Sequence, residues 1–232
     1  MDLRPSPEQE QLIGAFASLY AKESPPERVR AAEPLGFDKA MWDRLLETGA
    51  VAMAVAEEAG GWGASLLDLE LIAEQQGRAI AAAPVIEAQV AARLLSRLGV
   101  GVALDGRPLV TLALRPARDG VATLVPAGAV ADEAVIAVGD RLLLVPLEGR
   151  RTPVENLGGQ PLADVHIGDG AATVGTAGPE LQTALDEWMV LTAGDDHLRR
   201  DQRDPAHHHR PSRPGPSPVK PSGTLSHHRG LG

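Results

Sequence analysis

The chain has 232 residues, enough for one or two domains with a buried core, and 44% of them are hydrophobic, which excludes disorder throughout. It contains no cysteine, which excludes disulfides, thiolate catalysis and cysteine-based zinc sites and fits a reducing cytoplasm. The net charge of −9 disfavours a nucleic-acid partner, and no apolar run reaches the length needed to cross a membrane.

The first helix signal is a capping box. Ser6 and Gln9 are spaced to cap each other around a proline at the first helical position, Pro7. Apolar residues follow at helical spacing, and such a stripe requires partners to bury it. This stripe consists of Leu12, Ile13, Phe16, Leu19 and Tyr20.

Three further helices are expected before residue 100. Asp38 can cap a helix that ends near Gly49, and Ser65 can cap another. On the helix after Ser65, Glu74 and Arg78 stand one turn apart, as an exposed ion pair would. A last helix places Val90, Leu94 and Leu98 on one face and stops at Gly99. Residues 1–103 are therefore predicted to form an all-α domain.

The pattern changes to short β-prone runs near Asp105. These runs cover residues 108–114, 121–125, 134–138 and 141–145, and glycine or proline separates them. Residues 104–177 are predicted to form a small β domain, a barrel or a sandwich, which makes the fold class α+β.

Residues 178–193 are expected to start a helix that is interrupted. The composition changes abruptly at Gly194, and the segment 194–232 is rich in Pro, His and Arg and poor in apolar residues. This tail is predicted to be disordered. Three accounts of it are open: loose metal binding through its histidines, contact with an anionic or proline-reading partner, and a reading-frame shift near Ala193. The last would make the chain a truncated form.

Three strings in the helical part resemble a known family. They run from Met41 to Ala50, from Val55 to Gly63, and from Leu69 to Ala79, and a proline follows at position 84. Together they are similar to the N-terminal domain of acyl-CoA dehydrogenases, where a "PEE-x-GG-x-G" loop joins two helices. Here Ala56 stands in place of the usual proline. The resemblance covers residues 5–100 well and residues 105–193 more loosely.

The resemblance implies a helical N-domain, a central β domain and a C-terminal four-helix bundle. It also implies bound FAD, which removes a hydride from the β-carbon of an acyl-CoA after a glutamate takes the α-proton. The segment 113–120 lacks the threonine, glutamate and serine of the flavin-contacting motif, and no tryptophan lies between Trp62 and Trp188. The bundle that carries the catalytic glutamate is not found after Ala193. The resemblance therefore transfers no catalytic or cofactor-binding residue, and FAD binding by this chain is doubtful.

Two motifs invite a functional interpretation that the residues themselves weaken. The glycine-rich string 60–63 lacks the Lys-Ser/Thr of a phosphate-binding loop, which favours a turn between helices. Glu57 and Glu58 are adjacent in sequence and poorly placed to act as an acid/base pair, which favours a solvated turn.

Histidines offer the remaining candidates. Asp164 and His166 would share one face of a strand, as a dyad or half of a metal site, but a surface strand end is favoured because no third ligand is evident. Histidines 207–209 and 227–228 lie in the tail, where no fold would fix a metal's geometry. No metal site is therefore expected.

Two functional hypotheses follow. The first is a truncated acyl-CoA dehydrogenase homologue that is inactive alone. The second is a non-catalytic subunit that pairs with a complete acyl-CoA dehydrogenase. A third, an active flavoenzyme, requires flavin absorbance and acyl-CoA-dependent dye reduction.

Overall fold

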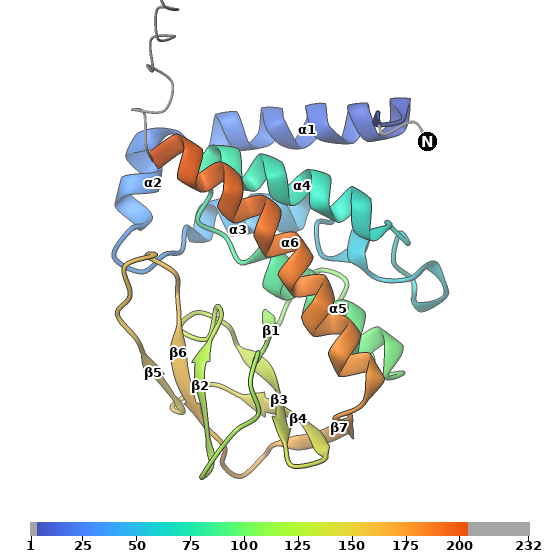
Figure 1. Cartoon of the computed structure of the whole chain (residues 1–232), viewed down its shortest axis with the longest axis vertical. Coiled ribbons are helices and arrows are strands. Elements are labelled where there is room, and N and C mark those ends of the chain that lie inside the picture. The colour runs from blue at the N-terminus through green and yellow to red at the C-terminus, as the bar shows by residue number, and fades with distance from the viewer. Residues whose placement is uncertain (1–3, 204–232) are drawn as a thin grey trace, which may run out of the picture.

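The computed structural model describes the backbone of residues 4–203 and the side chains of residues 4–195. Helices form the upper part of the molecule and strands the lower part (Figure 1). The helices before the sheets are α1 (Pro7–Glu23), α2 (Pro26–Ala32), α3 (Lys39–Glu47), α4 (Leu66–Ala79) and α5 (Val85–Arg97). Two 3-10 turns, η1 (Ala52–Ala54) and η2 (Glu57–Ala59), lie between α3 and α4.

The predicted helix starts are confirmed because their caps form. Ser6 and Gln9 make the capping box of α1, and Ser65 makes the same motif with Asp68 at α4. The Asp38 side chain accepts a hydrogen bond from the backbone N–H of Met41. One helix, α2, was missed, since two turns are too short to show an apolar period.

The β part consists of two sheets. One has the order β1-β3-β4-β7, in which β1 pairs with β3 in parallel and the other pairs are antiparallel; the second has the order β2-β6-β5 and is antiparallel. Buried residues of both sheets, Val125 and Ile136 among them, belong to one hydrophobic core. The strands are β1 (Val110–Leu112), β2 (Val121–Val125), β3 (Glu133–Val138), β4 (Arg141–Pro146), β5 (Arg151–Pro153), β6 (Ala163–His166) and β7 (Ala172–Thr176).

The predicted fold class, α+β with helices first, β sheets next and a final helix, is confirmed. Four strands match the apolar runs of the sequence. Of the other three, β5 and β7 were missed because they are largely exposed. For β6 the sequence indicated only a surface strand end at Asp164 and His166.

The final helix differs from the prediction in its length. Helix α6 (Pro179–Arg203) continues ten residues beyond Ala193, where an interruption was expected. The polar composition after Ala193 led to the expectation that the helix stops there. A helix can nevertheless continue through polar residues where it is not packed against the rest of the protein, because only a packed helix needs an apolar stripe. The part of the predicted tail from 204 to 232, including histidines 207–209 and 227–228, lies outside the described residues.

Helix α6 crosses α4 where both backbones come close. A Cβ added to Gly77 of α4 would lie 2.3 Å from the carbonyl oxygen of Asp195. A Cβ added to Gly194 of α6 would lie 2.0 Å from Oε1 of Glu70. Glycine is therefore required at position 77, where the contact is with backbone, whereas at position 194 the flexible Glu70 side chain could move aside. Gly194 and Asp195, which the sequence had placed in the tail, are part of the packed fold.

A buried carboxylate also links α6 to α5. Glu187 has an exposed fraction of 7% and accepts hydrogen bonds of 3.0 Å from Arg93 and Arg97. Arg93 donates in addition to the backbone carbonyls of Ala54 and Ala64, before α4. Glu187 thus ties α6 to the helical part through charge-assisted hydrogen bonds.

Within residues 4–203, no helix has both the length and the apolarity that crossing a bilayer would require.

Candidate functional site

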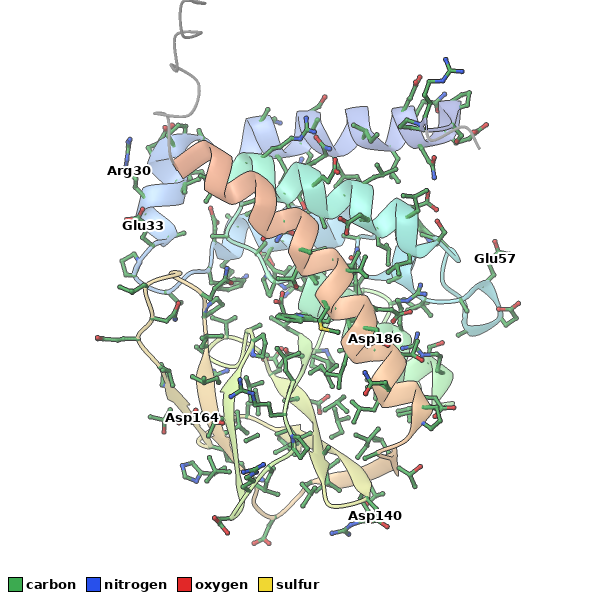
Figure 2. All side chains as sticks on the ribbon, in the orientation of Figure 1. Arg30, Glu33, Glu57, Asp140, Asp164 and Asp186 are labelled. Atoms are coloured by element: carbon green, nitrogen blue, oxygen red, sulfur yellow. The ribbon has the colours of Figure 1, made fainter. Side chains whose placement is uncertain are left out.

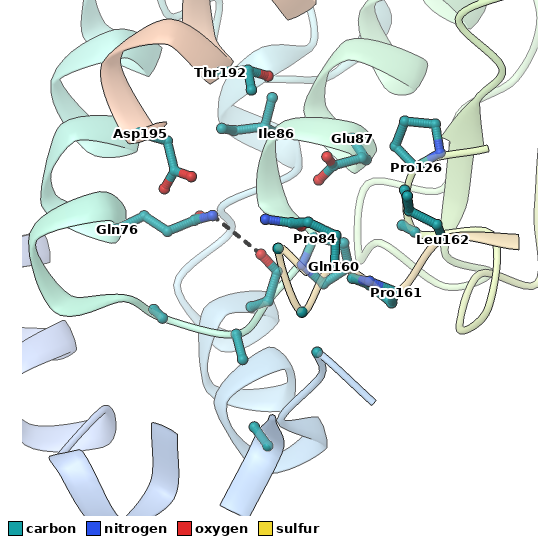
Figure 3. A pocket seen from close by; sticks show the side chains of 18 of the residues that line it. Gln76, Pro84, Ile86, Glu87, Pro126, Gln160, Pro161, Leu162, Thr192 and Asp195 are labelled. Atoms are coloured by element: carbon teal, nitrogen blue, oxygen red, sulfur yellow. Dashed lines mark hydrogen bonds between the residues drawn. The ribbon is translucent and has the colours of Figure 1, made fainter. Parts of the chain in front are cut away.

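A cavity of about 330 Å³ lies where the helical part, the sheets and α6 meet. Its walls come from the α2–α3 region, the turn between α4 and α5, the β1 and β2 ends, the β5–β6 loop and α6 (Figure 3). The volume is within the range of cavities that hold small organic ligands. Most lining residues are apolar, so the cavity suits an apolar group.

Non-glycine residues with left-handed backbone conformations gather at this cavity. Ile80, Leu124 and Ala127 have φ values of 49°, 53° and 55°, and all three line it. A β-branched residue such as Ile80 is rarely found in this region, because its Cβ crowds the backbone. Strained backbone of this kind concentrates at functional sites, and this concentration singles out the cavity.

The α4–α5 turn forms one wall. Ile80 ends α4, and the following small residues Ala81–Ala83 lead to Pro84 at the start of α5. The buried Gln76 side chain donates a 3.3 Å hydrogen bond to the carbonyl oxygen of Ala83, which fixes the turn against α4 (Figure 3).

A bulge in β2 forms the opposite wall. The pairing of β2 with β6 shifts register between Ala122 and Val125, which turns Thr123 and Leu124 toward the cavity. Oδ1 of Asp164 accepts a 2.8 Å hydrogen bond from the backbone N–H of Leu124. Asp164 therefore holds the bulge that shapes this wall; its position on the outer part of β6 is labelled in Figure 2.

We expect Asp164→Ala to lower the free energy of unfolding by about 1 kcal/mol, because the Leu124 N–H loses its acceptor. Asp164→Asn keeps an acceptor oxygen and should retain most of that stability. His166→Ala, two residues away on the exposed end of β6, is the matched control and should change stability by less than about 0.5 kcal/mol. Urea unfolding of the three variants measures the differences. Equal effects at Asp164 and His166 would contradict a role in holding the bulge.

The β5–β6 loop closes one end of the cavity. Asn156 stabilises the loop by accepting from the backbone N–H of Gln160 and donating to its carbonyl oxygen. Gly36, in the α2–α3 connection, approaches so closely that an added Cβ would lie 2.2 Å from the carbonyl oxygen of Gly159. The helical part and the β part therefore touch at this end.

Two side chains of α6 that line the cavity, Trp188 and Thr192, each have a polar atom without a hydrogen bond. Trp188 and Thr192 line the cavity one helical turn apart. The indole Nε1 and the hydroxyl Oγ1 are buried from water and form no hydrogen bond. A buried polar group left unsatisfied costs about 1–3 kcal/mol, so these two atoms lower the stability of the α6 wall.

The charges on the cavity wall are mainly negative. Glu33, Glu87 and Asp195 line it, and Arg115 is the cation among the described lining residues. Figure 3 shows the Asp195 carboxylate opposite Gln76. An anionic group would be repelled here.

A second acidic feature adjoins the cavity at the α4–α6 crossing. Burial raises the pKa of Glu70 to about 7, and the neighbouring Glu74 and Asp195 carboxylates raise it further in the same direction. Glu74 lies 3.7 Å from Arg78, so the exposed ion pair expected on this helix forms.

We expect Glu70→Gln to alter how stability depends on pH. The folded state binds the Glu70 proton more tightly than the unfolded chain, so this stabilisation is full below about pH 4.5 and is lost as the pH rises to about 7. The Gln variant should therefore be more stable than the wild type at pH 8, by about 1 kcal/mol after screening, and not at pH 4. Thermal unfolding across this pH range tests it, with exposed Glu10→Gln on α1 as control. A constant difference between wild type and Glu70→Gln would contradict the assignment.

The structure brings none of the other sequence candidates to the cavity. The glycine-rich string 60–63 is a turn, as favoured, and the backbone N–H groups of Gly61, Trp62 and Gly63 donate to backbone carbonyls, which leaves them unable to cradle a phosphate. Glu57 and Glu58 are exposed in η2 and are not among the residues that line the cavity. Figure 2 shows Glu57 on the opposite side of the molecule from Glu33, which does line it. Among the described residues, no three potential ligands cluster to hold a metal.

The residues that shape the cavity were missed by sequence reasoning. Trp188 and Thr192 were included only in the interrupted helix expected over residues 178–193. A non-glycine residue at a left-handed position, such as Ile80, leaves no sequence signal. The proline at position 84 was the one signal in this region, and it marks the turn.

Comparison with known proteins places the helical part in a family. Residues 6–100 match the family described as "Acyl-CoA dehydrogenase, N-terminal domain". The acyl-CoA dehydrogenase IpdE2 of Mycobacterium tuberculosis is 37% identical over 87 residues, which are 36% of this chain and 27% of the relative.

Solved structures extend the likeness to the β part. The ChsE4–ChsE5 complex from Mycobacterium tuberculosis matches with a TM-score of 0.72 and 22% identity, over 88% of this chain and 66% of that chain. An acyl-CoA dehydrogenase complexed with FAD from Bacillus anthracis matches with a TM-score of 0.63 and 17% identity, over 82% of this chain and 42% of that chain. These identities establish the shared fold alone, and this chain spans less than two thirds of each of these proteins. Residues 6–100 therefore match the N-terminal domain of acyl-CoA dehydrogenases.

Proposed function

We propose that this chain binds the apolar part of an acyl thioester in the cavity between its helical part, its sheets and α6, and that it does not dehydrogenate the acyl group alone. The observation that carries the proposal is the cavity itself: apolar walls from the α4–α5 turn, the β2 bulge and α6 enclose about 330 Å³. The similarity of residues 6–100 to the N-terminal domain of acyl-CoA dehydrogenases supports an acyl-CoA as the ligand class.

The residues at the β1 end of the cavity do not fit the flavin that the family implies. Leu114 and Arg115 line this wall immediately before Pro116, where the resemblance leads one to expect a threonine and a glutamate. An aliphatic side chain offers no hydrogen bond to a polar cofactor edge. No chemical step is therefore assigned to a flavin in this chain.

Titration calorimetry with octanoyl-CoA tests binding, and the visible spectrum of the purified protein with a dye-reduction assay tests catalysis. We expect saturable octanoyl-CoA binding, no flavin absorbance and no dye reduction. An absence of octanoyl-CoA binding would contradict the binding proposal. Flavin absorbance together with acyl-CoA-dependent dye reduction would instead support an active flavoenzyme.

The second candidate function is that of a non-catalytic subunit paired with a complete acyl-CoA dehydrogenase. Two observations favour it: a similar solved structure is described as a complex of two named components, ChsE4 and ChsE5, and α6 exposes Met189 and Val190 to 55% and 45%. Co-expression with each complete acyl-CoA dehydrogenase of the same genome, followed by light scattering, tests it. A stable stoichiometric complex is expected; separate elution from every candidate would contradict the pairing.

A further inference from the structure

A second, smaller cavity lies between α5 and the four-stranded sheet. Its volume is about 170 Å³, and none of its lining residues in the described part of the chain lines the first cavity. Helix α5 contributes Ala88, Ala92 and Leu95, which recur at helical spacing on one face. An apolar cavity of about 150 Å³ is large enough to hold benzene. The second cavity therefore has room for one small ring.

The sheet side of this cavity carries a carboxylate. The register of the sheet pairs Glu133 of β3 with Val110 of β1, and both residues line the cavity. Leu144 of β4 lines it as well. Because paired residues of neighbouring strands project from the same face of a sheet, the Glu133 side chain lies on the face that α5 covers, among aliphatic groups.

The connection between α5 and β1 closes the cavity, and its contacts with α3 hold it in place. Pro108 lines the cavity. Gly106 has a φ of 69°, and a Cβ added there would lie 2.4 Å from Cδ2 of Leu46. The guanidinium of Arg107 donates to the carboxylate of Asp43 on α3. Arg107 is therefore engaged with α3 and does not neutralise Glu133.

The Glu133 carboxylate lacks a counter-charge. No described residue donates a hydrogen bond to its oxygens or forms an ion pair with them, and both oxygens remain open to water, so a ligand can reach them. The other described lining residues carry neither a charge nor a hydroxyl group. Burial among them raises the pKa of Glu133, and the adjacent Asp132 carboxylate raises it further. A positive charge beside Glu133 would oppose both effects.

We propose that the second cavity binds a small primary amine, whose apolar body fills the space and whose ammonium group pairs with Glu133. An ammonium group supplies the counter-charge and up to three hydrogen-bond donors. An alcohol donates one hydrogen bond without charge, and a ligand carboxylate would be repelled. This site is separate from the proposed acyl-binding cavity and does not depend on that function.

Three probes share one ring and differ in the polar group: cyclohexylamine, cyclohexanol and cyclohexanecarboxylate. Chemical-shift titration of the full chain at neutral pH gives the Kd of each. We expect the wild type to bind cyclohexylamine about tenfold more tightly than cyclohexanol, because a charge-assisted hydrogen bond is gained, and to bind the carboxylate most weakly. The largest shifts should fall on Ala88, Ala92 and Leu95.

Glu133→Gln keeps the size of the side chain and removes its charge. It should reduce the preference for the amine to about twofold or less and leave cyclohexanol binding within about twofold, which also shows that the variant is folded. Glu148→Gln is the matched control, because Glu148 is exposed on the β4–β5 connection and does not line the cavity. This control should retain the tenfold preference of the wild type, about that of one charge-assisted hydrogen bond.

Three results would overturn the proposal. The first is equal affinity of the wild type for amine and alcohol, which requires no variant to measure. The second is a Glu133→Gln variant that keeps the full preference for the amine. The third is a set of shifts centred on Ile80 and Leu124, which line the first cavity and not the second.

Discussion

Gly77→Ala should destabilise the protein, although alanine normally stabilises a helix interior relative to glycine by about 1 kcal/mol. The new methyl group would lie 2.3 Å from the carbonyl oxygen of Asp195, which is backbone and cannot rotate away. Helix α6 would have to move off α4. We expect a loss of about 2 kcal/mol, which corresponds to a fall in Tm of about 4–8 °C for a chain of this size.

Gly14→Ala is the matched control, since Gly14 lies inside α1 with nothing within 4 Å of an added Cβ. This variant should gain about 0.5–1 kcal/mol. The two substitutions are chemically identical and are expected to have opposite signs. Stabilisation by both, measured by thermal unfolding, would show that α6 does not pack on α4 in this way.

Glu187→Ala should cost about 3 kcal/mol, because it leaves Arg93 and Arg97 partly buried without their carboxylate. The loss should appear in chemical denaturation as a lower midpoint. We also expect weaker binding of octanoyl-CoA, since Trp188 and Thr192 are on the same helix as Glu187 and form part of the cavity wall.

Glu74→Gln serves as the comparison for charge removal at the surface. Glu74 forms an exposed ion pair with Arg78, and such pairs contribute about 0.3–0.5 kcal/mol. If Glu187→Ala and Glu74→Gln lowered stability by a comparable amount, the buried contacts of Glu187 with Arg93 and Arg97 would contribute no more to stability than a surface ion pair does.

Local signals predicted much of the helical part. The capping residues Ser6, Asp38 and Ser65 determine where three helices start, because each satisfies a backbone N–H within three residues of itself. The strands with continuous apolar runs were found for a similar reason: their side chains are buried, and burial selects the residue types. By contrast, β5 lacks such a run, as all three of its residues are exposed.

The cavity could not be predicted because none of its properties is local. Its lining residues span positions 29 to 195 and meet only after the helices and sheets have packed. Asp164 was noticed, but as a partner of His166; its acceptor role depends on a bulge forty residues earlier, at Leu124. The end of α6 was misplaced because packing against α4 at Gly194 outweighs the change in composition there.

The cavity is enclosed by three parts of the chain, the helical part, the sheets and α6, and this arrangement couples ligand binding to the docking of α6. Since α6 contributes one complete wall, a ligand held in the cavity binds only to the arrangement in which α6 is docked on α4 and α5. Ligand binding and helix docking are therefore linked equilibria, and each favours the other to the same extent. A ligand present at one hundred times its Kd would add about 2.7 kcal/mol to the stability of the docked form. Occupancy of the cavity would thus determine how firmly α6 is held in place, and with it how the exposed side of that helix is presented to the surroundings.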